Sequence, residues 1–401
     1  MSRRVAIIGG GPAGSALVLN LLKRGVDPDD LVVLDRARFP RPKLCGGGIT
    51  WRGTRALEAL IGEPPGGART VGIEFRCKVG SVDVDEVGGQ WLFDRAELDN
   101  RLMDAVKAAG VEVREEVSVT GLEPGVDCWK VHTASGVERF EWVAGADGAT
   151  SLCRRATGLR GGIVGRLVEA VYEPTGAPPT GDRLYFDFDP VLDGIPGYAW
   201  IFPYPKPGGD NLWKLGIMDG RGRTSGKVLR QWTDRFAARH GFKRVEDKIA
   251  GWPELYYDWR TRGHCPGLVL VGEAFGVDAL LGEGIAPALF HAEYTAGRLA
   301  DALHRGTRRI RGFERGFART DEGWNLLFQA RLADRIYGPA GYRWLKVLMD
   351  LPRLTALAQR GEDAYGRLAK HAPSLCASYA YYVLTHGLPP ATPPALPVLG
   401  P

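Results

Sequence analysis

The sequence contains few cysteines, and none of them are closely paired. The six cysteines include no Cys-x-x-Cys pair, which argues against a zinc site and against a compact disulfide framework: Cys45, Cys77, Cys128, Cys153, Cys265 and Cys376. We therefore expect reduced thiols, no metal site and a cytoplasmic setting. The sequence also lacks a run of about 18 apolar residues, so we expect no transmembrane helix.

The chain lacks a strong charge of either sign. Its 52 lysines and arginines exceed its 47 acidic residues only slightly, and the net charge of +5 over 401 residues gives no case for nucleic acid as a partner. One basic cluster comprises Arg305, Arg308, Arg309, Arg311 and Arg315. This cluster has two interpretations: a peripheral contact with an anionic membrane or an acidic partner, and an ordinary solvated helix face.

Glycine, by contrast, is abundant, and the clearest motif is a glycine triplet. Four apolar residues, Val5–Ile8, predict a buried parallel strand, and the triplet after it has the Gly-x-Gly-x-x-Gly spacing of a dinucleotide-binding turn: Gly9, Gly11 and Gly14. The helix expected over 13–24 would point its N-terminus at phosphates. A second strand ends on Asp35, where a carboxylate can accept hydrogen bonds from an adenosine ribose. An ordinary tight turn is the alternative interpretation.

The loop over 36–48 follows directly. It contains two prolines, three consecutive glycines and four cationic side chains, so it forms no regular element. Because it leaves the carboxyl end of a parallel strand, it lies where ligands bind in open α/β sheets. Its glycines would let a flat ring approach the backbone, whereas a mobile surface loop is the alternative.

Two later stretches repeat the pattern of a buried strand followed by glycine and an acid. The strand expected over 138–146 ends in Asp147-Gly148, and the strand over 267–271 ends in Gly272-Glu273. A glycine-rich segment, Gly282 to Ile285, then opens a long helix to about residue 303. The nucleotide-binding domain is therefore expected to be discontinuous.

Between these stretches the composition changes to short, aromatic-rich segments separated by Pro/Gly turns, typical of an antiparallel sheet. Alternation places Tyr198, Trp200 and Phe202 on one face, which is either plain core or a wall facing a bound ring and an apolar substrate. We expect a mixed α/β fold. A Rossmann-like domain would cover 1–70, 94–161 and 260–305, and an antiparallel-sheet substrate domain 71–93 and 162–259. A helical C-terminal region would cover 306–387, and a proline-rich tail 388–401.

Taken together, these motifs resemble the flavoprotein monooxygenase superfamily. The motifs are the glycine triplet, the Phe39-Pro40-Arg41-x-Lys43-x-Cys45-Gly46 loop, Asp147-Gly148 and the segment ending at Ile285. Within that superfamily the chain is most similar to the geranylgeranyl reductase family, whose Tyr-x-Trp-x-Phe-Pro strand matches Tyr198 to Pro203. The resemblance covers roughly residues 1–303.

The resemblance implies that FAD is the dinucleotide. The residues expected to bind it are Gly9, Gly11, Pro12, Ala13, Gly14, Asp35, Arg36, Cys45, Gly46, Gly47, Arg95, Asp147, Gly148, Gly272, Glu273, Gly282, Gly284 and Ile285. Arg95 would lie near the phosphates, and Glu273 near the ribityl chain, where the family pattern has Asp. The helix after Gly282 would stabilise the negative charge of reduced flavin.

The expected catalytic residues are Cys45, Tyr198 and Trp200. In the family this cysteine lies close to the flavin and the substrate cavity, so Cys45 is either a proton donor or simply a small residue in a tight loop. The segment Asp278 to Leu281 departs from the family, which commonly has a proline and a small polar residue there.

These features favour an FAD-dependent enzyme that reduces a C=C bond of an apolar, isoprenoid-like or natural-product substrate by hydride transfer. The first alternative is a flavin-dependent monooxygenase or a halogenase; many halogenases carry Trp-x-Trp-x-Ile-Pro where this chain has Tyr198 to Pro203. The second is a flavin-binding protein without catalysis. No second complete glycine motif is present for NAD(P)H, so electrons would come from transiently docked NAD(P)H or from a separate reductase.

Overall fold

The computed structural model describes residues 4–350 except 65, 178–181 and 207–210, together with scattered positions between 370 and 390. The expected helical region beyond residue 350 therefore lies largely outside the described residues, as does most of the proline-rich tail. Within the described part, no helix has the length and apolar character needed to cross a bilayer.

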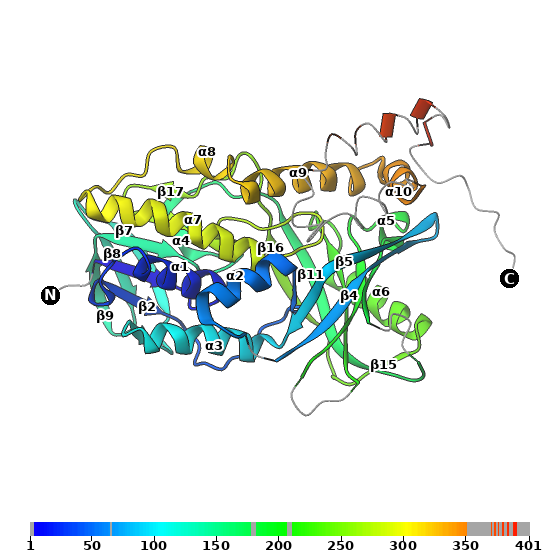
Figure 1. Cartoon of the computed structure of the whole chain (residues 1–401), viewed down its shortest axis with the longest axis horizontal. Helices are drawn as coiled ribbons and strands as arrows, with labels where there is room; N and C mark the ends of the chain where they lie inside the picture. The colour runs from blue at the N-terminus through cyan, green and yellow to red at the C-terminus, as the bar shows by residue number, and fades with distance from the viewer. Residues whose placement is uncertain are drawn as a thin grey trace, which may run out of the picture.

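A parallel sheet with one antiparallel edge strand forms the first part of the molecule (Figure 1). Its strand order is β17-β18-β10-β1-β2-β6. The strands are β1 (Val5–Ile8), β2 (Leu31–Leu34), β6 (Glu112–Arg114), β10 (Trp142–Gly145), β17 (His264–Cys265) and β18 (Leu268–Leu270). Strands β10 and β18 pair in parallel with this sheet, as expected for a chain that leaves the nucleotide-binding unit and later returns.

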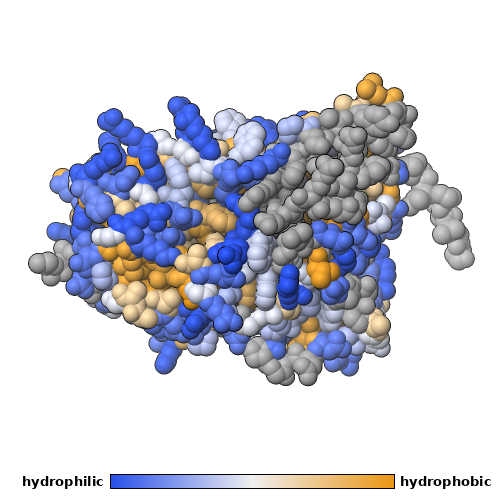
Figure 2. Space-filling view, in the orientation of Figure 1, coloured by the Kyte–Doolittle hydropathy of each residue, from blue (hydrophilic) through white to orange (hydrophobic). Residues whose placement is uncertain are grey.

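Helices pack against one another and against this sheet. Helix α1 lies against α3 and α7, and Figure 2 shows hydrophobic side chains gathered over α1 between those two helices. The helices of this part are α1 (Pro12–Leu22), η1 (Pro28–Asp30), α2 (Trp51–Ile61), α3 (Arg95–Ala108), α4 (Leu152–Thr157), η2 (Gly272–Ala274) and α7 (Ile285–His304). Asp94 caps α3, because its carboxylate accepts from the N–H groups of Ala96 and Glu97.

A small antiparallel sheet packs on the same core: β7 (Val119–Pro124), β8 (Trp129–Thr133) and β9 (Gly136–Phe140). The single strand expected over 138–146 is therefore wrong. The chain breaks near Glu141 into β9, which pairs with β8, and β10, which enters the parallel sheet. Strand β9 is mostly exposed and β10 is buried, and the break depends on the pairing of β9 with the distant β8, which the local pattern does not reveal.

A nine-stranded sheet forms the second part, in the order β15-β11-β14-β13-β12-β4-β5-β3 with β16 paired to β11. Its strands are β3 (Gly48–Ile49), β4 (Gly67–Cys77), β5 (Gly80–Phe93), β11 (Val164–Pro174), β12 (Arg183–Asp187), β13 (Ala199–Pro203), β14 (Trp213–Asp219), β15 (Phe242–Arg244) and β16 (Ala250–Leu255). The sheet is not purely antiparallel, because β12 pairs with β4 in parallel.

The remaining helices are α5 (Asp189–Leu192), α6 (Gly226–Arg239), α8 (Phe313–Phe317), α9 (Asp321–Ile336) and α10 (Gly341–Asp350). Figure 1 shows α9 and α10 running from the parallel-sheet part toward the long β4–β5 hairpin, which α10 contacts. The predicted domain boundaries remain a prediction. Of the basic cluster, Arg305, Arg308, Arg309 and Arg311 lie in the connection between α7 and α8 rather than on a helix face. Arg308 donates to the backbone oxygens of Glu141 and Val126.

Candidate cofactor and substrate cavity

A large cavity is lined by residues from both the parallel sheet and the nine-stranded sheet. Its volume is about 1030 Å³. Small-molecule pockets usually occupy roughly 300–1,000 Å³. The volume of this cavity lies at the upper end of that range, as a ligand of the size of a dinucleotide requires.

The glycine turn forms one end of this cavity. Gly9 has a φ of +102°, and a Cβ there would lie 2.4 Å from the backbone oxygen of Ala146. A Cβ on Gly14 would lie 1.9 Å from the oxygen of Gly9, so the turn requires glycine at both positions. The start of α1 then faces the cavity through Gly11, Pro12 and Ala13, in the orientation that suits an anionic group.

Asp35 is a buried acceptor at the same end. Its carboxylate accepts from the Gly10 N–H at 2.7 Å and from the Ala37 N–H at 2.8 Å, while its side chain lines the cavity. A carboxylate offers about four acceptor sites. The two backbone bonds therefore fix its orientation and leave capacity for ribose hydroxyls.

The hydrogen bonds of the Asp147 carboxylate test whether the cavity residues fit a bound ligand. Its Oδ2 accepts from the N–H groups of Leu152 and Cys153, at 2.7 and 3.1 Å, at the start of α4. Its Oδ1 is buried and has no hydrogen-bond partner among the described residues. Because leaving a buried carboxylate oxygen unpaired is costly, this atom fits a donor that a bound ligand supplies in the cavity.

Two arginines lie at the cavity with Asp99 behind them. Arg95 donates two bonds to the Asp99 carboxylate, both at 2.9 Å, and the Arg41 Nη2 lies 3.3 Å from Asp99 Oδ2. Burial opposes the charge of Arg95, but Asp99 outweighs it and raises the pKa of the guanidinium. The Arg41 Nη2 would lie 3.4 Å from a Cβ on Gly11. Arg41 is therefore the cation beside the glycine turn, whereas Arg95 lies next to Cys45.

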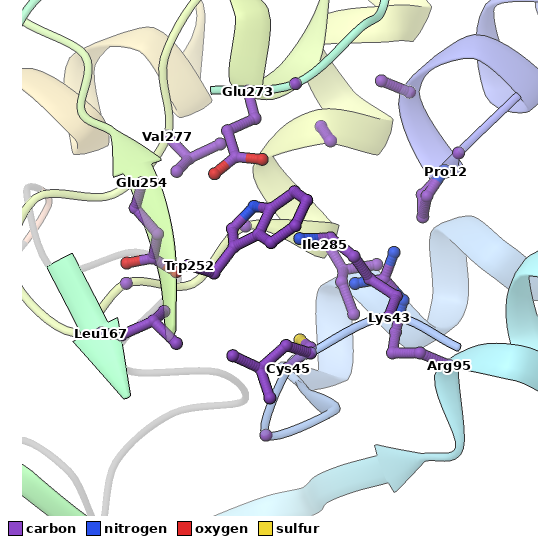
Figure 3. A pocket seen from close by; sticks show the side chains of 18 of the residues that line it. Pro12, Lys43, Cys45, Arg95, Leu167, Trp252, Glu254, Glu273, Val277 and Ile285 are labelled. Carbon is purple, nitrogen blue, oxygen red and sulfur yellow. The ribbon is translucent and has the colours of Figure 1, made fainter. Parts of the chain in front are cut away.

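A buried lysine, Lys214, binds the backbone of the Cys45 loop. Lys214 Nζ donates to the Cys45 backbone oxygen at 2.6 Å and lies 3.9 Å from the Glu169 carboxylate. Gly46 packs closely on Phe202, since a Cβ there would lie 2.8 Å from its ring. Figure 3 shows Cys45 and Trp252 facing the same cavity. Lys43 Nζ lies 3.8 Å from the centroid of the Trp252 ring.

The returning segment closes the other side of the cavity. Glu273, Gly282, Gly284 and Ile285 line it, and Figure 3 shows the Glu273 carboxylate pointing inward. Burial raises the pKa of Glu273. Gly272 does not line the cavity; its N–H donates to His291 Nδ1 at 3.1 Å.

The segment Asp278 to Leu281, which departs from the family pattern, is held in place by hydrogen bonds. The Asp278 carboxylate accepts from the N–H groups of Leu280 and Leu281 at 2.7 and 3.0 Å. The Tyr198 hydroxyl donates to the Leu281 oxygen, and the Tyr337 hydroxyl of the helical region donates to the Leu280 oxygen. Burial raises the pKa of Tyr198, and its hydrogen bond to Leu281 holds the ring at the cavity wall.

An apolar wall adjoins this segment, formed by Ile73, Leu167, Leu184, Phe186, Tyr198, Trp200, Phe202 and Met218. The rings of Phe186 and Phe202 meet edge-on with centroids 5.1 Å apart, and Trp200 lies against Phe202 at 6.2 Å. The expected face of Tyr198, Trp200 and Phe202 is thus both core and cavity wall.

The cavity brings together nearly all the residues singled out in the sequence. Only Gly14 and Gly272 among them do not line it, since Gly14 serves the turn and Gly272 packs against Ala13. Their roles toward a ligand remain predictions. Sequence analysis missed several lining residues: Arg41, Lys43, Trp252, Glu254 and Glu283. The first two belong to the loop already recognised, but nothing in the local sequence marks Trp252 or Glu254.

The chain is similar to several known proteins in sequence and in fold. Residues 2–170 match the family described as FAD binding domain. The chain is 27% identical to a menaquinone reductase of Mycolicibacterium smegmatis over 381 residues, covering 87% of this chain and 85% of that protein. Its fold is similar to that of a geranylgeranyl bacteriochlorophyll reductase-like protein from Thermoplasma acidophilum, with a TM-score of 0.75, 16% identity and coverage of 95% and 98% of the two chains. It is also similar to the halogenase PltM, with a TM-score of 0.66, 16% identity and coverage of 98% and 89%.

Proposed function

We propose that this chain, an FAD-dependent oxidoreductase of the flavoprotein monooxygenase superfamily, reduces a C=C bond in an apolar, isoprenoid-like or natural-product substrate. The observation that carries the proposal is the apolar wall, which continues directly from the expected FAD site into the nine-stranded sheet. Burying aliphatic substrate surface there is favourable by about 25 cal/mol per Å².

The residues present fit FAD. Asp35 would bind the adenosine ribose, the glycine turn and Arg41 would lie at the phosphates, and Asp147 Oδ1 would accept a hydrogen bond from the cofactor. When bound and reduced, FAD supplies a hydride. The chain must then orient the double bond, exclude water and deliver a proton. Tyr198 and Trp200 are suited to the first two tasks because both are buried and fixed.

Relatives agree with a substrate of this class. The menaquinone reductase of M. smegmatis is named for a reductive reaction, and the T. acidophilum protein resembles a reductase named for a geranylgeranyl group. NAD(P)H that docks transiently, or a separate reductase protein, would supply the electrons. A peripheral membrane contact would give access to such apolar substrates.

The test is anaerobic reoxidation. The FAD-loaded enzyme is reduced without oxygen and mixed with geranylgeraniol or a short-chain menaquinone, and the return of the oxidised flavin absorbance is followed. We expect reoxidation and a product that gains two hydrogens and keeps them in air, whereas a quinol would return to the quinone. Reoxidation only in the presence of oxygen, with an added oxygen atom in the product, would contradict the proposal.

Oxygenation or halogenation is the second candidate, and one observation favours it. Lys43 lies at the cavity, with its Nζ over the Trp252 ring, so a lysine is available to handle an oxidised halide. The other lysine near the loop, Lys214, already donates to Cys45. An experiment that supplies the reduced enzyme with oxygen, bromide and a phenolic probe distinguishes halogenation from C=C reduction. A brominated product supports this candidate, and unmodified phenol contradicts halogenation.

A further inference from the structure

Glu254 is a half-buried acid at the meeting point of the two parts of the cavity. It lies on β16 and lines the cavity, where Figure 3 shows its carboxylate near Trp252 and Leu167. Three side chains converge on Gly282. A Cβ built there would lie 3.0 Å from Glu254 Oε2, 3.3 Å from Met218 Sδ and 3.5 Å from the Tyr198 hydroxyl. Glu254 therefore lies between the apolar wall and the glycine segment expected at the flavin.

The surroundings of Glu254 favour its neutral form. Charged and titratable groups face it from five segments: Lys43, Tyr198, Tyr256, Glu273 and Asp278. Burial and the negative charge of Glu273 raise the pKa of Glu254 to about 8, and the hydrogen bond from Tyr256 and the charge of Lys43 only partly offset them. At neutral pH the side chain is therefore a carboxylic acid that still holds its proton.

The Tyr256 hydroxyl links Glu254 to Met218. The Tyr256 hydroxyl lies 3.1 Å from Glu254 Oε2 and 3.0 Å from Met218 Sδ. Because a tyrosine has one hydroxyl proton, it can donate to only one of the two at a time. When Glu254 is neutral, its Oε2 can donate to the tyrosine oxygen while the tyrosine donates to the sulfur. When Glu254 is ionised, the tyrosine donates to Oε2, and this bond partly offsets the effect of burial on the pKa of Glu254.

Cys45, the other candidate proton donor, lies in a different environment. The Gly47 N–H points at its sulfur at 3.4 Å, and the Arg95 guanidinium lies within hydrogen-bonding reach of it. Both neighbours are donors, so the sulfur is placed as an acceptor.

We propose that Glu254 is the catalytic acid of the reduction: it faces the substrate end of the cavity and donates its proton to the carbon beside the one that receives hydride. This inference rests on the proposed function. Two electrons leave the reduced cofactor with the hydride, and the C=C π bond is replaced by two C–H bonds. The second C–H bond takes the Glu254 proton. The carboxylate that remains takes a proton from water.

The kinetic test compares wild-type enzyme with Glu254→Gln, which keeps the shape of the side chain but cannot supply the proton. Both are loaded with FAD, reduced without oxygen and mixed with geranylgeraniol. We expect wild-type reoxidation to slow as the pH rises through about 8. We expect Glu254→Gln to be slowed by about 10²–10⁴-fold at pH 7 and to lose that pH dependence. The matched control is Glu173→Gln, an exposed acid outside the cavity, which should behave as wild type.

A second readout needs no turnover. Because other buried carboxyls can also hold a proton, the readout is the infrared difference between wild-type and Glu254→Gln holoenzyme. This difference should contain the carbonyl band of a protonated carboxylic acid at pH 7, and that band should fade as the pH rises through about 8. An unslowed Glu254→Gln enzyme, or a Glu254 found ionised at pH 7, overturns the inference. Failure of wild-type enzyme to reduce any alkene overturns the proposed function instead, while the infrared band still reports on Glu254. Cys45→Ala, which leaves Glu254 in place, should keep the pH dependence.

Discussion

At the scale of single residues, Asp35 connects a sequence motif to a measurable affinity. Its two backbone hydrogen bonds fix the carboxylate at the end of β2, facing the cavity. The prediction is that Asp35→Asn weakens FAD binding, since a bond to a charged group is worth about 1.5–3 kcal/mol, which corresponds to roughly 10- to 100-fold in Kd. Titration of apoprotein with FAD, followed by flavin fluorescence, measures this.

The ligand itself supplies the control for Asp35. FMN lacks the adenosine half, so Asp35→Asn should leave FMN affinity unchanged. Asp104→Asn, an exposed carboxylate on α3, should change neither. Equal losses for FAD and FMN would mean that the substitution disturbs the turn rather than a ribose contact.

At the scale of elements, two strands of the nine-stranded sheet support the Cys45 loop. Lys214 on β14 and Glu169 on β11 are both buried. The lysine lies 3.9 Å from the Glu169 carboxylate, donates to the Cys45 oxygen and lies over the Tyr204 ring. Burial raises the pKa of Glu169, and the lysine opposes that rise. The backbone of the Cys45 loop is thus fixed by two side chains of the sheet. The sequence of the loop itself does not specify this contact.

Removing one member of this pair should cost more than removing both. Lys214→Met leaves Glu169 buried without its cation and should lower the free energy of unfolding by about 3–5 kcal/mol. Adding Glu169→Gln should recover much of that loss. Chemical denaturation of the apoproteins checks this, with Lys243→Met, an exposed partner of Glu173, as the control. Additive losses in the double variant would refute a coupled pair.

At the scale of the whole molecule, sequence patterns located the nucleotide-binding part better than the substrate part. The glycine turn and Asp35 belong to one continuous strand–helix–strand unit, and their placement depends on its backbone geometry, so their spacing is informative. The convergence of Glu254, Met218 and Tyr198 at Gly282 depends on pairing among strands far apart in the chain. No local period encodes that arrangement, and the break between β9 and β10 was missed for the same reason.

Residues from both sheets line the cavity, and this leads to a prediction about the whole chain. A ligand that contacts Asp35 at one end and the Gly282 segment at the other binds only when both parts are folded together. FAD should therefore raise the thermal unfolding temperature of the apoprotein, because a ligand at 100 times its Kd stabilises the folded state by about 2.7 kcal/mol. FMN at the same concentration should raise it less, since it cannot use the Asp35 end. Differential scanning calorimetry with each ligand measures the two shifts. Equal shifts would show that the glycine turn contributes no binding energy and would remove the basis for assigning the adenosine half to it.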